Sequence, residues 1–308
     1  MQNLLVTGGA GFIGSNLALK LQETYSTARI VVVDDFRSGD FKNLEGFKGD
    51  FVAADVSRID WNAQFKERTF DAIFHEASIT DTTVHDQFLQ VHDNVEGFRR
   101  LLEFARGSHT PVVYASSAAT YGIGSGAMRE DQPPRPANVY AFSKVQLDNL
   151  AREYARQSTA WKIVGVRYFN VYGPRETHKK AAASMIYQLY LQMKAGKRPR
   201  VFKAGEQKRD FVYVKDVVRM TMQALNAPQS GTFNCGSGIA TSFNEVIAAL
   251  NKSLGTKLET EYFENPYSFY QPHTEADMTL AKNDLRYTPE FPPDKGIADY
   301  VSILERRA

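Results

Sequence analysis

The stretch LLVTGGAGFIG, residues 4–14, decides the fold of this chain. A short apolar run ends at Thr7 and leads directly into glycines spaced G-x-x-G-x-x-G from Gly8 and G-x-G-x-x-G from Gly9, and a helical segment follows. Glycines in such a strand–turn–helix allow the backbone to approach a pyrophosphate closely. Free amides and the positive end of the helix dipole then meet its charge. The stretch therefore predicts a dinucleotide-binding unit.

Acidic residues follow the second expected strand, at the place where such units contact an adenosine ribose. The run at 30–33 ends in Asp34 and Asp35, about 20 residues after the last glycine of the turn. Asp34 favours NAD because it repels a 2′-phosphate, whereas Arg37 is able to pair with one, so the two signals conflict. Asp55, after the third expected strand, suits either an adenine contact or a helix cap.

Short apolar runs alternate with helix-like stretches through the first half of the chain. They predict strands at 3–7, 29–34, 51–54, 72–75, 111–116 and 163–168. Such runs are typical of parallel strands covered on both faces, so the fold class predicted is α/β, a doubly wound, Rossmann-type parallel sheet. Helices are expected at 182–195, 216–226 and 243–254. We expect a dinucleotide-binding lobe at 1–172 with a returning segment at about 212–236, and a smaller α/β substrate-binding lobe at 173–211 and 237–308.

Composition excludes several other classes of protein. The 308 residues include 37 Lys and Arg against 35 Asp and Glu, which gives no electrostatic basis for binding nucleic acid. No apolar run approaches the roughly 20 residues of a membrane helix. Cys235 is the only cysteine, so no disulfide within the chain is expected and a cytoplasmic location fits. The six histidines lack ligand spacing, so no metal site is expected.

A phenol and an ammonium group lie four residues apart at Tyr140 and Lys144, on one face of an expected helix. Lys144 is placed to lower the pKa of Tyr140 and to bind a nicotinamide ribose, and the phenolate then removes a hydroxyl proton. The spacing alone is weak, since Tyr190 and Lys194 repeat it, and we expect that second pair on the surface. Ser117 strengthens the first pair: it ends an expected strand, where it holds a substrate hydroxyl or caps a turn.

Together, the glycine loop, the Ser-Ser-Ala strand end at 116–118, the Tyr140/Lys144 pair and the run RYFNVYGPR at 167–175 resemble the extended short-chain dehydrogenase/reductase family. The resemblance spans essentially the whole chain. It implies NAD(P) in the N-terminal lobe and a nucleotide sugar in the C-terminal lobe. The cofactor contacts expected are Gly8, Gly11, Phe12, Ile13, Gly14, Asp34, Asp35, Asp55, Glu76, Ala77, Ser78, Asn94, Lys144 and Val171.

Within that family the chain is similar to the branch that epimerises ADP-heptose at C6″. This similarity rests on HEAS at 75–78, SSAATYG at 116–122, NVY at 138–140, ETHK at 176–179, KRDFVYV at 208–214 and TEAD at 274–277. It implies oxidation to a transient 6″-ketone and non-stereospecific hydride return, with Tyr140 and Lys179 as two bases. The substrate contacts implied are Asn170, Lys179, Gln188, Phe202, Lys203, Ala204, Gly205, Arg209 and Tyr270.

The same resemblance implies tightly bound NADP, with NAD as the alternative, and a homo-oligomer, a pentamer or else a dimer. It places the reaction in heptose supply for the lipopolysaccharide core of Gram-negative bacteria. Three residues depart from the pattern. Asp40 stands where a lysine is expected near a 2′-phosphate, Gln188 replaces a histidine, and Lys180 replaces a glycine. Asp40 in particular leaves the choice of cofactor open.

Other functions remain as alternatives to heptose epimerisation. The nearest is a UDP-sugar 4-epimerase or another nucleotide-sugar-modifying member of the family, such as a dehydratase, although the Thr-Asp-Glu strand end usual in dehydratases is absent at 117–119. A serine hydrolase is disfavoured, because no G-x-S-x-G elbow surrounds Ser117. A cofactor-sensing protein without catalysis is weakly supported, since Ser117, Tyr140 and Lys144 are all present.

Overall fold

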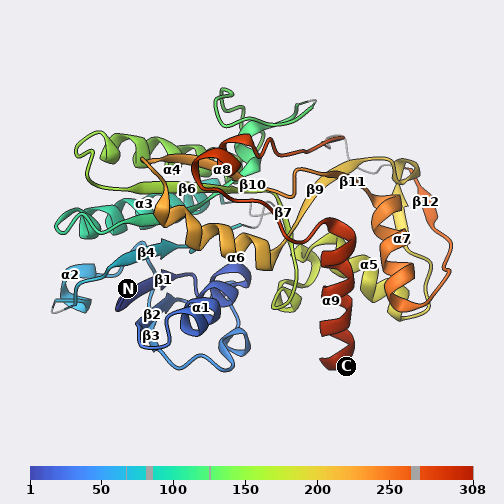
Figure 1. Ribbon diagram of the computed structural model, residues 1–308, viewed down its shortest axis with the longest axis horizontal. Helices are drawn as coiled ribbons and strands as arrows, with labels where there is room; N and C mark the ends of the chain where they lie inside the picture. Colours follow the sequence, from blue (N-terminus) through green and yellow to red (C-terminus); the bar gives the residue numbers. More distant parts are fainter. Residues whose placement is uncertain (67, 81–85, 125, 265–270, 308) are drawn as a thin grey trace.

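Seven parallel strands form the central sheet in the order β10-β6-β5-β4-β1-β2-β3 (Figure 1). The computed structural model describes residues 1–66, 68–80, 86–124, 126–264 and 271–307. The strands are β1 (Asn3–Thr7), β2 (Arg29–Asp34), β3 (Asp50–Ala53), β4 (Ala72–His75), β5 (Val112–Ser117), β6 (Ile163–Tyr168) and β10 (Gly231–Cys235). The strand order reverses between β1 and β4, and ligands of open α/β sheets bind at such a switch point.

Apolar side chains on both faces explain why these runs become central strands. Leu4 and Val6 of β1 enter the core on one face of the sheet, and Leu5 enters a second core on the other. Predicted and observed strand bounds agree for four strands. β3 begins and ends one residue earlier than predicted, and β5 one residue later. The doubly wound parallel sheet is therefore confirmed, whereas the division into lobes remains a prediction.

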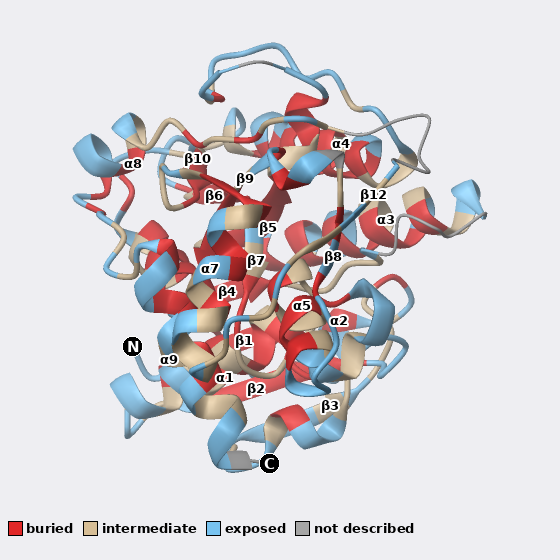
Figure 2. Ribbon diagram, turned by 90° about the vertical axis from the view of Figure 1, so that its right-hand side faces the viewer, coloured by how far each residue is buried: buried red, intermediate tan, exposed pale blue. Residues whose placement is uncertain are grey.

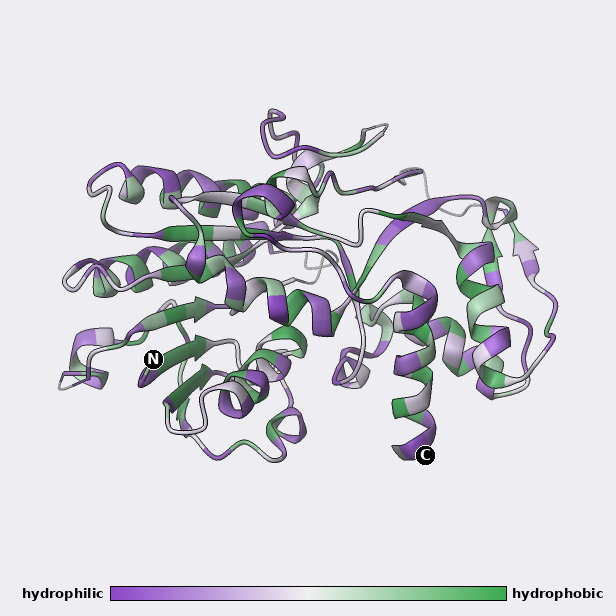
Figure 3. Ribbon diagram, in the orientation of Figure 1, coloured by the Kyte–Doolittle hydropathy of each residue, from purple (hydrophilic) through white to green (hydrophobic). Residues whose placement is uncertain are grey.

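Helices cover both faces of the sheet. The core on the Leu4 face includes residues of α1 (Phe12–Thr24) and α6 (Val214–Gln223). The core on the Leu5 face includes residues of α2 (Trp61–Gln64), α3 (Gln87–Arg106) and α4 (Val139–Ala155). Figure 2 shows the strands buried between these layers, and Figure 3 shows their hydrophobic residues running through the middle of the molecule.

A second group of elements lies at the right of Figure 1. It contains a three-stranded sheet ordered β11-β9-β7 and a two-stranded sheet of β12 and β8. The strands are β7 (Asn170–Tyr172), β8 (Arg200–Phe202), β9 (Lys208–Tyr213), β11 (Ala240–Ser242) and β12 (Glu261–Phe263). The helices are α5 (Met185–Lys194), α7 (Phe243–Leu254) and α9 (Pro293–Arg307), whereas α8 (Thr279–Asp284) lies beside β10 of the central sheet. Because β7 begins two residues after β6 ends, it carries the chain from the central sheet into this group.

The helix predictions for this part are largely confirmed. The stretch expected at 182–195 forms α5, the one at 243–254 matches α7, and the one at 216–226 begins earlier, as α6, and ends in a 3₁₀ turn. One expectation about α5 is wrong: Tyr190 is buried, because its ring packs in the core and its hydroxyl donates to Glu305 of α9 at 2.7 Å. Short 3₁₀ segments complete the described chain: η1 (Phe41–Leu44), η2 (Ala118–Tyr121), η3 (Thr177–Ala182), η4 (Lys203–Gly205) and η5 (Ala224–Asn226).

None of the helices that the structure describes is both long enough and apolar enough to cross a bilayer.

Candidate active site

A cavity of about 1220 Å³ lies at the carboxyl ends of the central strands and continues into the second group of elements. Every residue predicted to contact the cofactor lines it, from the glycine loop to Val171 of β7. Ser117, Tyr140, Lys144 and Lys179, the residues predicted to be catalytic, line it as well. The fold therefore brings together side chains that are up to about 170 positions apart in the sequence; their roles remain predictions.

The glycine loop needs its glycines for close backbone approach. A Cβ on Gly14 would lie 2.2 Å from the carbonyl oxygen of Gly8, and one on Gly8 would lie 2.5 Å from the amide nitrogen of Ala77. Gly8 also has φ +67°, a left-handed conformation that costs other residues energy. The loop therefore lies directly against the end of β4, and Gly8, Gly11 and Gly14 line the cavity at the place where a dinucleotide is expected.

Two buried hydroxyls in the cavity fit a bound dinucleotide. The Oγ atoms of Ser78 and Ser116 are buried and have no hydrogen-bond partner among the described residues, yet both residues line the cavity. Buried polar atoms are normally hydrogen-bonded, so these two are placed to bind a ligand with polar groups. These two hydroxyls and the glycine loop together form a site that fits NAD(P).

The acidic residues after β2 are engaged within the protein. Asp34 is buried, and its two carboxylate oxygens accept hydrogen bonds from the amides of Ala10 at 2.9 Å and Phe36 at 2.8 Å. Burial raises the pKa of Asp34, and the two amide hydrogen bonds oppose this rise. Asp34 therefore braces the glycine loop at the same position from which it is expected to meet the ribose.

Arg37 is held by three carboxylates from different parts of the fold. It forms ion pairs with Asp35 at 2.6 Å, with Asp55 at 2.9 Å, and with Asp93 of α3. Asp55 also accepts a hydrogen bond from Ser57, so it serves as a turn residue as well as lining the cavity. The Arg37 guanidinium, which in the sequence favoured NADP, is thus surrounded by negative charge.

Lys144 is buried beneath Tyr140 on α4. Its Nζ donates to the carbonyl oxygen of Ala115 at 2.7 Å and lies 5.8 Å from the centre of the Tyr140 ring. Burial lowers the pKa of Lys144 to about 8, although the charge of Glu76 opposes this shift. The Lys144 ammonium group is therefore held by a backbone carbonyl, and no carboxylate of the described residues forms an ion pair with it.

Burial also raises the pKa of Tyr140, and a hydrogen bond with Ser117 partly offsets this rise. The charge of Glu76 raises the pKa of Tyr140 further, so the shift is opposite to the lowering that we expected from Lys144. The Ser117 hydroxyl also accepts from the amide of Ala119 at 3.1 Å and so caps η2, which is one of the two roles that the sequence left open. The contact of Ser117 with a substrate hydroxyl remains a prediction.

Glu76, directly after β4, is an acidic group whose charge acts on both Tyr140 and Lys144. It accepts a hydrogen bond from the Tyr168 hydroxyl at 2.8 Å, and that hydroxyl also contacts Thr221 at 2.8 Å. Burial raises the pKa of Glu76 to about 7, and the Tyr168 hydrogen bond and the charge of Lys144 act in the opposite direction. Glu76 therefore exchanges its proton in the physiological range.

This shift predicts how stability depends on pH. The folded protein holds the Glu76 proton more tightly than the unfolded chain does, whose ordinary pKa is near 4.5. The resulting stability is complete below that pH and is lost as pH rises through about 7. Replacing Glu76 with Gln removes this loss. We expect the free energy of unfolding of Glu76→Gln, relative to the unmodified protein, to rise by roughly 2 kcal/mol between about pH 5 and pH 8.

Denaturant titrations at the two pH values measure this difference. Glu23→Gln, an exposed carboxylate on α1, is the matched control and should show a much smaller change. An equal effect of Glu76→Gln at both pH values would contradict the prediction.

Lys179 enters the cavity from η3, on a segment with a buried carboxylate behind it. Glu176 accepts hydrogen bonds from the amide of Gly173 at 3.0 Å and from the hydroxyl of Ser184 at 2.8 Å. The Nζ of Lys179 lies 5.6 Å from the centre of the Phe12 ring. Burial lowers the pKa of Lys179, opposed by the charge of Glu176. This is the direction that a lysine needs in order to act as a base.

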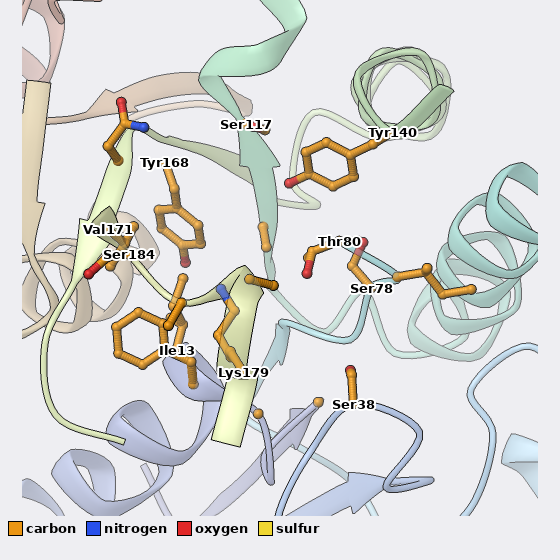
Figure 4. A pocket seen from close by; sticks show the side chains of 18 of the residues that line it. Ile13, Ser38, Ser78, Thr80, Ser117, Tyr140, Tyr168, Val171, Lys179 and Ser184 are labelled. Carbon is orange, nitrogen blue, oxygen red and sulfur yellow. The ribbon is translucent and has the colours of Figure 1, made fainter. Parts of the chain in front are cut away.

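Figure 4 shows Tyr140 and Lys179 entering the same cavity from different elements. Tyr140 comes from α4 on one side of the view. Lys179 comes from the other side, near Ile13, with its Nζ pointing inward. Ser38, Ser78 and Thr80 direct their hydroxyls into the cavity near them. Two ionisable side chains therefore share one space without contacting each other in any interaction that the structure gives.

The predicted substrate residues are only partly brought together. Asn170, Gln188, Phe202 and Arg209 line the cavity. Ala204 and Gly205 are not among the lining residues, and a Cβ on Gly205 would lie 2.2 Å from the Asn244 side chain. The two are therefore placed against Asn244 of α7, and their contact with substrate remains a prediction. Tyr270 lies outside the described residues, and of Lys203 only the backbone is described, in η4.

Sequence reasoning missed several residues at this end of the cavity. They come from α5, β8, β9, α7 and β12 and the loop before β9: Gln192, Arg200, Gln207, Phe211, Phe243 and Phe263. Only Phe211 had a usable signal, because it lies inside the KRDFVYV run at 208–214. Within the described chain, no group of three His, Cys, Asp or Glu side chains is arranged to hold a metal ion.

The chain belongs to the NAD dependent epimerase/dehydratase family, whose model matches residues 4–236. Among solved structures it is similar to the ADP-L-glycero-D-manno-heptose-6-epimerase of Helicobacter pylori, with 42% identity, TM-score 0.92, and coverage of 99% of this chain and 96% of that one. The family and this relative show the chain to be an enzyme, an isomerase of the epimerase type.

Two further structures place it among enzymes of nucleotide sugars. UDP-glucose 4-epimerase of Thermotoga maritima shares 28% identity at TM-score 0.91, covering 99% of both chains. UDP-glucuronic acid 4-epimerase of Bacillus cereus, solved with UDP-glucuronic acid and NAD, shares 28% identity at TM-score 0.84, with 98% and 100% covered.

Proposed function

We propose that the protein interconverts ADP-D-glycero-D-manno-heptose and ADP-L-glycero-D-manno-heptose at C6″. The observation that carries this proposal is the presence of Lys179 and Tyr140 in one cavity, on two different elements. The similarity to the Helicobacter pylori heptose epimerase supports the choice of substrate. Bound NAD(P) supplies a hydride acceptor that later returns the hydride.

Two bases follow from the geometry of the reaction. Hydride must pass along a fixed direction in both halves of the turnover, so the hydroxyl at C6″ points to different sides in the two epimers. One base removes the hydroxyl proton of the first epimer as the carbon loses hydride, which gives the ketone. After the ketone has turned over, the other residue delivers a proton to its oxygen as hydride returns to the opposite face. No net redox change occurs.

Each residue of the site has a distinct task in this scheme. Tyr140 accepts or donates the proton on one side, with Ser117 hydrogen-bonded to it and Lys144 beneath its ring. Lys179 does the same on the other side, with its pKa lowered by burial. Arg209 and Gln188 line the far end of the cavity, where a guanidinium and an amide suit a diphosphate and a sugar.

Proton NMR in deuterated water tests this function. The purified protein is incubated with ADP-D-glycero-D-manno-heptose without added cofactor. We expect the L-glycero epimer to appear with no deuterium at C6″, because hydride returns directly. Deuterium at C6″ would point to deprotonation of carbon and contradict the mechanism.

A UDP-sugar 4-epimerase is the second candidate, favoured by the full-length similarity to the Thermotoga maritima enzyme. A parallel tube with UDP-glucose separates the two. If UDP-galactose forms and ADP-heptose is not converted, the assignment of the active site stands and the substrate is a UDP-sugar.

The charges around Arg37 favour NAD over the NADP that the resemblance predicts. Arg37 is paired with Asp35, Asp55 and Asp93, and Asp40 stands where a lysine was expected. A 2′-phosphate brings about two negative charges into this acidic surrounding, and among the described residues the only lysines that line the cavity are Lys144 and Lys179, which are assigned above to the reacting end. We therefore expect the protein to bind NAD at least about tenfold more tightly than NADP.

Removing one of these carboxylates is expected to weaken the preference. Asp93→Asn keeps the shape of a buried side chain and frees part of the Arg37 guanidinium, so the affinity for NADP relative to NAD should rise by about tenfold. Titration calorimetry with each dinucleotide measures this ratio. Asp131→Asn, an exposed carboxylate paired with Arg129, is the control and should leave it unchanged. Tighter binding of NADP than NAD by the unmodified protein would overturn the assignment.

The assembly and the cellular setting remain predictions from the resemblance. We expect a homo-oligomer, with a pentamer ahead of a dimer, and analytical ultracentrifugation distinguishes the two. A cytoplasmic reaction that supplies heptose for lipopolysaccharide fits the proposed substrate.

A further inference from the structure

The segment that carries Lys179 is fastened to the dinucleotide-binding end of the molecule. Asn16 of α1 donates through Nδ2 to the carbonyl oxygen of Pro174 at 2.9 Å. Lys179 itself lies over the Phe12 ring, at the start of the same helix. The third link is a 3.0 Å hydrogen bond between Nδ2 of Asn43 and Nδ1 of His178, the residue directly before Lys179.

Asn43 is placed to join two loops. It is buried in η1, and its Nδ2 also donates to the carbonyl oxygen of Ala10 at 3.0 Å. An amide nitrogen has two hydrogens, so one serves Ala10 and the other serves His178. Nδ1 of His178 is therefore the acceptor, which assigns the ring hydrogen to Nε2 in the neutral form.

The neutral form of His178 is consistent with its surroundings. Burial lowers its pKa, although hydrogen bonds with the backbone of Arg175 and Ser38 and the charge of Asp40 oppose this shift. The positive charge of Lys179 also lowers it. Neutral His178 thus accepts from Asn43 while it contacts the loop after β2 through Ser38.

Ala10, the other partner of Asn43, lies inside the glycine loop. Its amide donates to Asp34 at 2.9 Å, and its carbonyl oxygen also accepts from the amide of Asp40 at 3.0 Å. A continuous series of hydrogen bonds therefore runs from Asp34 through Ala10 and Asn43 to His178. Asp34 and His178 line the cavity, Ala10 precedes Gly11, which also lines it, and Asn43 joins Ala10 to His178.

The backbone of the Lys179 segment needs such support. Arg175, before residues 176–179, has φ +74°, and Lys180, after them, has φ +50°. Both are non-glycine residues in a backbone conformation that L-residues rarely adopt. Strained residues persist only where the surrounding structure holds them. Glu176 fixes the segment from behind, through Gly173 and Ser184, and His178 fixes it from the cofactor side.

We propose that His178 is a positioning residue, which acts with Asn43 to place Lys179 by tying its segment to the glycine loop. The placement of the second base is then coupled to the loop that receives the dinucleotide. This inference rests on the proposed function, because it takes Lys179 as one of two bases.

The test uses the cofactor-loaded enzyme and follows each half of the reaction separately. A single turnover with one epimer reduces the bound cofactor, which is seen by the absorbance of the reduced nicotinamide. Lys179→Met and Tyr140→Phe first assign which epimer depends on which base. We expect His178→Leu to slow reduction by the Lys179-dependent epimer by more than about tenfold and to leave the other epimer within about twofold.

Conservative and matched variants separate positioning from general damage. His178→Gln supplies an acceptor for Asn43 and should restore most of the lost rate. Asn43→Ser removes the same link from the other side, and it replaces His178→Leu if thermal unfolding shows that variant to be misfolded. Thr177→Ala alters an exposed neighbour on η3 and should match the unmodified enzyme.

The outcomes are distinct. Equal losses with both epimers, or no loss in either His178→Leu or Asn43→Ser, would overturn the positioning role. Failure of the unmodified enzyme to convert either epimer into the other would instead overturn the proposed function.

Discussion

Replacing Tyr140 with Phe is expected to lower kcat for epimerisation by about 10³-fold. The variant removes the phenol oxygen, which is the group that exchanges a proton with the substrate, and leaves the ring that lies over Lys144. Epimerisation needs both bases in each turnover, so the loss should appear in both directions. The rate is measured by NMR on the cofactor-loaded protein.

The binding of cofactor and substrate should change little in Tyr140→Phe, because the ring still fills its place on α4. KM is therefore expected to stay within about threefold while kcat falls. Tyr262→Phe removes the hydroxyl of an exposed tyrosine that is not among the residues lining the cavity, and it is the matched control. A Tyr140→Phe variant that retained a kcat within threefold of the unmodified enzyme would remove Tyr140 from the mechanism.

The fold could be predicted because its signals are local. In β1, Leu4, Leu5 and Val6 are apolar in succession since neighbouring helices cover both faces, and this pattern is visible in a short window. β10 lacked such a signal, because its Gly-Thr-Phe-Asn-Cys run mixes polar and apolar residues. Its Asn234 is buried by partners far along the chain, with Nδ2 donating to Met128 at 2.7 Å.

The site was predictable where one segment carries the chemistry and unpredictable where segments combine. Tyr140 and Lys144 share a helix, so their proximity followed from spacing. The role of Arg37 did not follow, because Asp93 reaches it from α3 and Asp55 from beyond β3. In the sequence Arg37 suggested NADP, but in the folded protein its charge is paired with carboxylates.

The direction of the pKa shift of Tyr140 could likewise not be predicted from the sequence. Lys144 is present at the expected spacing, yet its ammonium donates to Ala115 and burial dominates the pKa of the phenol. Charge and burial depend on everything that packs around the pair, whereas spacing reports only on the pair itself.

Replacing Lys179 with Met is expected to lower kcat for epimerisation by about 10²- to 10³-fold. Methionine keeps a long side chain over Phe12 and leaves the Glu176 hydrogen bonds intact, so the change removes the amine and little else. Lys180→Met is the matched control, since Lys180 is the exposed next residue on the same segment. Epimerisation by Lys179→Met at near the unmodified rate would end the two-base scheme.

The two variants should differ in which epimer they oxidise, and measuring this difference tests the two-base scheme directly. With one base lost, the remaining one still removes a proton from the epimer whose hydroxyl faces it, so the bound cofactor becomes reduced once and the ketone is trapped. Tyr140→Phe should do this with one epimer and Lys179→Met with the other. If both variants retained the same epimer, a single base would serve both hydroxyl positions, and Lys179 would be left with binding the substrate.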